Sequence, residues 1–233
     1  MPLFAQSPTS GEPYVLAASL DKACHISSLL RAVHFQDHTT CFAMANGLRV
    51  TVEDTKCIQA NAFIQAEILQ EFAAQEESVM FWINLSVLLN CLTIFGISSL
   101  PGTSTALRMC YHGYGYPLML FLEEGGVVTV CKINTQEPDE LLDFDFCRSI
   151  HLDYPRDSDL MEAFHCNQTQ TNSYKISLLK SSTKALALSC EVSIRTDTQG
   201  FLSLQYMIRN EDGLTCFVEY YCCPDEDITE AEP

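Results

Sequence analysis

A cluster of acidic residues in the middle of the chain could support metal-dependent chemistry. An acidic, proline-bearing segment (135–141) is followed by the alternating run 142–147, which contains Asp143 and Asp145. Alternation places these two carboxylates on the same face of a predicted strand. Converging carboxylates can hold metal ions and position water for the cleavage of a phosphodiester bond. A surface strand beside an acidic linker explains the same residues without catalysis, and both interpretations stay open.

Other catalytic patterns are not found in the sequence. There is neither a G-x-S-x-G elbow nor a Walker loop, and the segment 113–117 lacks the third glycine of a dinucleotide-binding loop. His165 and Cys166 are neighbours on a predicted strand, so their side chains point to opposite faces. None of the 12 cysteines forms a C-x-x-C pair, which favours core thiols in a reducing compartment over zinc ligands. We therefore predict no metal and no cofactor. Asp143 and Asp145 are weak candidates for a nuclease site, and the sequence supports no other enzyme activity.

Basic residues are few, but several fall on predicted helices. The chain has 13 Lys and Arg against 30 Asp and Glu, and a net charge of −17 excludes a generally basic protein that coats DNA. Local cations could still face phosphates within about one Debye length, roughly 8 Å. The candidates are Lys22, His25 and Arg31 on the predicted helix 21–33, Lys180 and Lys184 on the predicted helix 178–188, and Lys175 just before it. Ordinary solvated helix faces are the alternative interpretation.

Two apolar residues interrupt polar strand faces. Phe63 shares its face with Asn61 and Gln65, and Met207 lies on the face of Gln205 and Arg209. An exposed aromatic or methionine side chain on a polar face is typical of an anchor for a partner protein. Single exposed apolar residues are also common without any such role.

The periodicity of the sequence predicts an α+β fold with antiparallel sheets, built from repeated units of strand, helix and several strands. The first unit has strands at 14–20, 39–45, 48–54 and 56–65 and a helix at 21–33 that Asp21 would cap; the second has strands at 79–85, 105–112, 116–123 and 127–134 and a helix at 86–95; a third has strands at 173–177, 190–196, 201–209 and 215–222 and the helix 178–188. The charge-free stretch 78–107 is thus a strand and a helix rather than a membrane span. Residues 1–13 do not resemble a signal peptide.

Four long runs give the chain a recognisable family. Residues 51–66, 105–138, 151–170 and 200–213 closely resemble the radiation-response "one" subunits of the heterotrimeric nine-one-one DNA-damage checkpoint clamp, which are similar in fold to proliferating cell nuclear antigen. The resemblance implies a sliding-clamp fold of two domains, each with two units, and three subunits that close a ring around duplex DNA. The sequence departs from that pattern at Cys147 and Arg148, where a helix and two strands are missing and leave the second domain incomplete.

The resemblance implies a domain division and a set of partners. Residues 1–13 would be a disordered lead-in, 14–134 the first clamp domain, 135–141 the interdomain connector, 142–224 the shortened second domain, and 225–233 an acidic tail. The implied partners are two other clamp subunits, a clamp loader, repair and checkpoint proteins, and double-stranded DNA without sequence preference. No membrane contact is implied, and the location would be nuclear.

The resemblance also implies roles for particular residues. Lys22, Arg31, Lys175, Lys180 and Lys184 would line the DNA channel. The two subunit edges would be Val127, Val128, Thr129, Val130 and Ile133 at one end and His151, Leu152 and Tyr154 at the other. Partner peptides would dock beside Glu137, Pro138 and Leu141 of the connector, in addition to the anchors Phe63 and Met207 that the strand alternation indicates.

Two alternatives remain beside a non-enzymatic clamp subunit. A 3′ to 5′ exodeoxyribonuclease activity has been ascribed to the family, and Asp143 and Asp145 would be its candidates. Alternatively, the shortened chain fails to close a ring and sequesters one partner. The sequence does not decide whether the second domain folds or joins the ring, nor the order of the subunits or their regulatory modifications.

Overall fold

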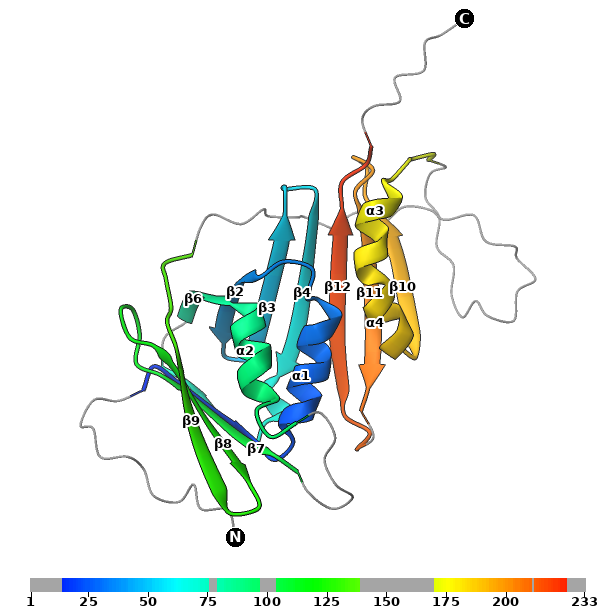
Figure 1. Cartoon of the computed structure of the whole chain (residues 1–233). Helices are drawn as coiled ribbons and strands as arrows, with labels where there is room; N and C mark the ends of the chain where they lie inside the picture. The colour runs from blue at the N-terminus through cyan, green and yellow to red at the C-terminus, as the bar shows by residue number, and fades with distance from the viewer. Residues whose placement is uncertain (1–13, 76–78, 97–103, 139–169, 211, 226–233) are drawn as a thin grey trace, which may run out of the picture.

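The computed structural model describes residues 14–75, 79–96, 104–138, 170–210 and 212–225. Its strands form two antiparallel sheets, and its helices gather on one face of the larger sheet (Figure 1). None of the helices in the described residues has both the length and the hydrophobicity of a membrane-spanning segment.

The smaller sheet has five strands. In spatial order they are β5 (Glu71–Ala74), β1 (Leu16–Leu20), β7 (Ala106–Tyr111), β8 (Leu118–Glu124) and β9 (Val127–Ile133). The alternation in β8 buries Leu118, Leu120 and Leu122. Fully burying a leucine contributes about 1.5–3 kcal/mol, so this alternation fixes which face of the sheet meets the core.

Among the described residues, the larger sheet has seven strands and joins strands of the first unit to strands of the third. In spatial order they are β10 (Glu191–Thr196), β11 (Leu202–Arg209), β12 (Thr215–Cys222), β4 (Ile58–Gln65), β3 (Gly47–Asp54), β2 (His38–Met44) and β6 (Val79–Asn84). Strand β12 pairs with β4 over six residue pairs, from Phe217 opposite Phe63 to Cys222 opposite Ile58. The predicted first and second domains therefore share one continuous sheet.

The first two units exchange their opening strands. Strand β1 pairs with β5 on one side and with β7 of the second unit on the other, whereas β6 pairs with β2 of the first unit. Each sheet consequently contains strands from both units, and their apolar faces enclose a common core with the helices between. This reciprocal pairing confirms the predicted repeat of strand, helix and strands.

The helices lie on the face of the seven-stranded sheet that points to the viewer in Figure 1. They are α1 (Ala23–Ala32), α2 (Leu85–Leu92), and a run of α3 (Ile176–Leu179), η3 (Lys180–Ser182) and α4 (Thr183–Leu188); a further short turn, η2 (Ala66–Ile68), follows β4. Helix α1 buries Ala23, Ile26, Leu29 and Leu30, the three- and four-residue spacing of an amphipathic helix. It packs against both α2 and α4.

Tyr220 ties two helical segments to the centre of the sheet. Its ring is fully buried on β12, and its hydroxyl donates to the carbonyl oxygens of Ala32 at 2.5 Å and Ser181 at 3.0 Å. Ala32 ends α1, and Ser181 lies in η3. The hydroxyl thus satisfies the Ala32 carbonyl group at the end of α1 and holds η3 beside it.

Most strand and hairpin predictions are confirmed, but four local details are wrong. Asp21 does not cap α1, because Lys22 occupies the N-cap position and makes no side-chain capping bond. Residues 173–175 form no strand, and helix begins instead at Ile176. The sequence did not predict β5, a short strand whose burial alternates only weakly. Helix α2 ends at Leu92 rather than at position 95.

The cysteines that the structure describes are free thiols, and four of them lie in the core as the sequence predicted. Cys41, Cys110, Cys216 and Cys222 are buried. Burial raises the pKa of Cys41 and of Cys222 to about 12, because a thiolate is poorly solvated in the core. These four thiols behave as small hydrophobic residues, whereas Cys24 and Cys190 are exposed.

Candidate functional site

The helices present a mixed polar surface to solvent. On α1 the exposed residues are Cys24, Ser28 and Arg31, and α2 exposes Val87 and Asn90. Helix α2 contributes no cation to this surface. Positive charge must therefore come from α1 and from the run α3–α4.

Three of the predicted channel cations are exposed on these helices. The Arg31 Nε lies 3.4 Å from the Ser27 hydroxyl oxygen, and the Lys184 Nζ donates to the His34 carbonyl oxygen at 3.2 Å. Lys180 is exposed on η3. Their side chains reach solvent on the face that carries all the helices, which is the arrangement that loose phosphate contact needs.

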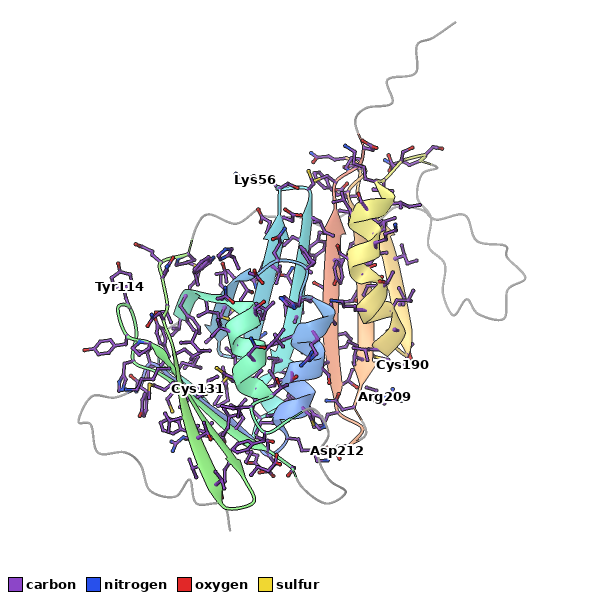
Figure 2. The ribbon with its side chains drawn as sticks, viewed as in Figure 1. Lys56, Tyr114, Cys131, Cys190, Arg209 and Asp212 are labelled. Carbon is purple, nitrogen blue, oxygen red and sulfur yellow. The ribbon has the colours of Figure 1, made fainter. Side chains whose placement is uncertain are left out.

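The other two predicted cations are already paired with acids. The Lys22 Nζ lies 2.6 Å from the Asp212 Oδ2, and the Lys175 Nζ lies 3.3 Å from the Asp225 Oδ1. The His25 Nε2 is 3.6 Å from the same Asp212 oxygen. The hydrogen bond from Lys22 holds the pKa of Asp212 below its ordinary value. Figure 2 labels Asp212 at the turn between β11 and β12, beside the start of α1. Lys22 and Lys175 are thus weaker candidates for phosphate contact than the other three.

Strand β9 forms an open edge of the five-stranded sheet. Within the described part of the chain, only β8 pairs with it. Val127, Val128 and Val130 are 57%, 46% and 48% exposed, and Thr129 is half-buried. An apolar edge strand with free backbone groups is suited to pairing with another chain. Ile133 is buried, so it could offer only its backbone; His151, Leu152 and Tyr154, predicted for the other edge, lie outside the described residues.

The outer face of the seven-stranded sheet carries a row of apolar side chains. Phe63 on β4 lies opposite Phe217 on β12, and Phe217 lies opposite Met207 on β11. On the other side of Phe63 lies Arg49, whose guanidinium is 4.2 Å from the centre of the Phe42 ring. We call Phe63, Phe217 and Met207 the outer-face row.

Phe217 was missed in the sequence. It shares its strand face with Thr215, Glu219 and Tyr221, so it carries the same signal of an aromatic residue on a polar face that selected Phe63. Beside the row is a hollow of about 230 Å³, lined by Phe63, Phe217, Gly47, Gln205 and Glu219 among others. The structure therefore brings Phe63 and Met207 into one surface, with Phe217 between them.

The first residues of the predicted connector continue the seven-stranded sheet at its far edge. Gln136 exchanges two backbone hydrogen bonds of 3.0 Å with Trp82 on β6, and Thr135 donates to the Tyr116 carbonyl oxygen at 2.8 Å. Glu137 is exposed and Pro138 is half-buried. Leu141, Asp143 and Asp145 lie outside the described residues. Among the residues that are described, no group of three or more His, Cys, Asp and Glu side chains could hold a metal ion.

Comparison with known sequences identifies the family. A model of the family "Repair protein Rad1/Rec1/Rad17" matches residues 15–150 and 148–208. The chain belongs to the Rad1/Rec1/Rad17 family. The cell cycle checkpoint protein RAD1 of Homo sapiens is 60% identical over 281 aligned positions, which include 100% of both chains, and that of Mus musculus is 58% identical, with 99% of this chain and 100% of the relative aligned. The DNA damage checkpoint control protein rad1 of Schizosaccharomyces pombe is 24% identical, with 89% and 85% aligned.

Solved structures show the fold. The proliferating cellular nuclear antigen of Entamoeba histolytica has a TM-score of 0.69 with 13% identity, covering 91% of this chain and 100% of that one. PCNA of Thermococcus kodakaraensis has a TM-score of 0.67 with 14% identity, covering 90% and 100%. The chain therefore has the sliding-clamp fold that the resemblance implied.

This member of the Rad1/Rec1/Rad17 family is shorter than its relatives. The alignment with the human protein covers 281 positions, whereas the chain has 233 residues, so the remaining positions have no counterpart here. The two segments matched by the family model meet at residues 148–150. That junction coincides with Cys147 and Arg148, where the sequence predicted the missing helix and strands.

Proposed function

We propose that this chain is a non-enzymatic subunit of a heterotrimeric, ring-shaped DNA-damage checkpoint clamp, which encircles DNA and carries repair and signalling factors. Membership of the Rad1/Rec1/Rad17 family, the checkpoint names of its relatives and the sliding-clamp fold support this function. The single observation that carries it is the combination of helices on one sheet face with an open apolar strand, β9, at the margin of the other sheet.

Ring closure would use the edge of β9. An edge strand can add to a sheet of the next subunit by backbone hydrogen bonds, and the valine side chains on β9 would lose their exposed area in that contact. Val127, Val128, Thr129 and Val130 are the contact candidates, with Ile133 as a backbone contact. The other edge would include His151, Leu152 and Tyr154.

Contact with DNA would be weak and independent of base sequence. Arg31, Lys180 and Lys184 would face phosphates across water, since a ring holds its duplex by enclosure rather than by base readout. Counterion release then makes the affinity fall as salt rises. The overall charge of −17 would oppose any tighter electrostatic grip.

Repair and checkpoint proteins would dock on the outer-face row and beside the connector. Phe63, Phe217 and Met207 are half-buried, and Glu137, Pro138 and Leu141 follow the segment that is hydrogen-bonded to β6. The same proposal includes a clamp loader as partner, a nuclear location and no cofactor. It also includes the domain limits 14–134, 135–141 and 142–224.

A second candidate function is sequestration of one clamp partner. Two observations favour it. The two segments of the family match meet at residues 148–150, and apolar side chains are exposed on α4 and β10, so both point to a missing segment in the second domain. The β9 edge of the first domain is intact. A chain of this kind would bind the partner that β9 recognises and leave the ring open.

The native mass of the complex with the two partner subunits tests both functions. A particle with one copy of each subunit supports the ring, and a stable pair with one partner supports sequestration. Changing Val128→Glu and Val130→Lys on β9 should weaken the β9 partner's binding at least tenfold, while Tyr114→Ala, an exposed aromatic change on the β7–β8 loop, should not. Failure to bind either partner would refute both functions.

A further inference from the structure

Apolar side chains remain exposed at the end of the seven-stranded sheet that carries β10. Leu186 and Leu188 on α4 are 54% and 45% exposed, and Val192 on β10 is 38% exposed. We call these three residues the β10 margin. Among the described strands, β10 pairs with β11 only, and none of them pairs with its other backbone edge. Figure 1 shows α4 lying in front of β10 and β11.

The sequence of β10 is complementary to itself when read in the opposite direction. Glu191 and Arg195 lie on the same face of the strand, two positions before and two positions after Ser193, and both are exposed. In an antiparallel pair centred on Ser193, Glu191 faces Arg195 of the second copy, and Val192 faces Ile194 of the second copy. Opposite charges directly across a strand pair are favourable, and like charges are unfavourable.

We propose that two copies of this chain pair antiparallel through β10, with a two-fold axis at Ser193. The contact is isologous, since the same strand of both copies forms it and the contact of Glu191 with Arg195 occurs twice, once on each side of the axis. Backbone hydrogen bonds would complete the open edge, and the β10 margin would supply the apolar area. The two contacts between Glu191 and Arg195 set the register of the paired strands. They add little affinity of their own, because exposed ion pairs are weak.

This contact is separate from the proposed ring contact. The β9 edge belongs to the five-stranded sheet, and β10 is the end strand of the other sheet. Loss of ring assembly through β9 would therefore leave the β10 pairing unchanged, and the reverse also holds.

The mass of the purified full chain, measured by sedimentation equilibrium, tests the pairing. At about 100 μM, above the dissociation constants of many weak dimers, we expect about twice the chain mass of 26.1 kDa, falling toward a single chain on dilution. Arg195→Glu places two acids opposite each other at both ends of the strand pair. The dissociation constant of the dimer should therefore rise at least tenfold.

A charge exchange supplies the decisive control. The double variant Glu191→Arg, Arg195→Glu restores opposite charges across the axis and should recover the dimer. Val128→Glu on β9 should leave the dimer unchanged. A single-chain mass for the unaltered protein at every concentration overturns the proposal, and would mean that another segment or another protein covers β10. A dissociation constant that Arg195→Glu leaves unchanged, or a dimer that is lost with Val128→Glu, also overturns it.

Discussion

The ammonium group of Lys22 lies 2.6 Å from a carboxylate oxygen of Asp212, although 190 positions separate the two residues. The contact joins the start of α1 to the turn between β11 and β12. It also neutralises a cation that the sequence alone assigns to the DNA channel. Helical position and charge therefore do not suffice to select phosphate contacts in this protein.

Removing the Asp212 carboxylate should strengthen DNA binding by the assembled complex. Asp212→Asn releases Lys22 and His25 from their acidic neighbour, so the slope of log affinity against log salt should steepen by up to about 1. Lys180→Gln should lower the slope by a similar amount. Titrations of duplex DNA at several salt concentrations measure both, with Glu67→Gln on η2 as the control. Equal slopes for all variants would exclude these residues from the channel.

The outer-face row should matter for partner recruitment and not for ring assembly. Truncating an aromatic anchor in a well-packed contact typically costs about 2 kcal/mol or more, which is roughly a 30-fold loss of affinity. We expect this loss for a recruited repair protein with Phe63→Ala or Phe217→Ala, measured by titration against the assembled complex. Tyr114→Ala, which removes a 77% exposed ring elsewhere, should leave the affinity unchanged. Full binding by both row variants would contradict this site.

Replacing Tyr220 with phenylalanine should destabilise the fold. The change removes the hydroxyl that serves the carbonyl oxygens of Ala32 and Ser181, and a buried acceptor left without a partner costs about 1–3 kcal/mol. Urea unfolding gives the free energy directly. Tyr114→Phe, at an exposed position, is the matched control and should change stability by no more than about 0.5 kcal/mol. Equal stability of both variants would show that the Tyr220 hydroxyl contributes nothing net.

Gly47 cannot be replaced without moving the backbone of β4. Its φ is +137°, and a Cβ there would lie 2.1 Å from the Ile64 carbonyl oxygen. Gly47→Ala should therefore cost more than the roughly 1–2 kcal/mol of left-handed strain alone. Gly125→Ala has φ +58° and open space, so it should show only that strain. Thermal or urea unfolding that ranked the two variants the other way would refute the predicted clash.

Stability should decline at alkaline pH. Burial raises the pKa of the Cys41 thiol from 9.0 to about 12, so the unfolded chain ionises this group first. Its contribution is fully present below about pH 9 and is lost as the pH rises toward 12, by up to about 1.4 kcal/mol per pH unit. Urea unfolding at a series of alkaline pH values should show this slope, and Cys41→Ala should make it shallower. An unchanged slope would mean that Cys41 is not among the groups responsible.

Local pattern in the sequence predicted most strands, because apolar alternation and the turn at Asn46 and Gly47 are local signals. It failed where distant segments decide the outcome. The pairing of β12 with β4 brings Phe217 beside Phe63, and no local periodicity encodes that neighbourhood. Lys22 occupies the helix N-cap position and meets Asp212 for the same reason. The family resemblance, by contrast, gave the clamp fold and the position of the missing segment because it rests on long runs of residues.

The hydrogen-bonded seam between β4 and β12 has a mechanical consequence. A ring must open to admit a duplex, and the movement occurs where the protein deforms most easily. Here one uninterrupted sheet spans both halves of the subunit, and Tyr220 clasps two helical segments against its middle. We therefore expect the ring to bend at the interfaces between subunits during loading, while this subunit moves as a rigid body.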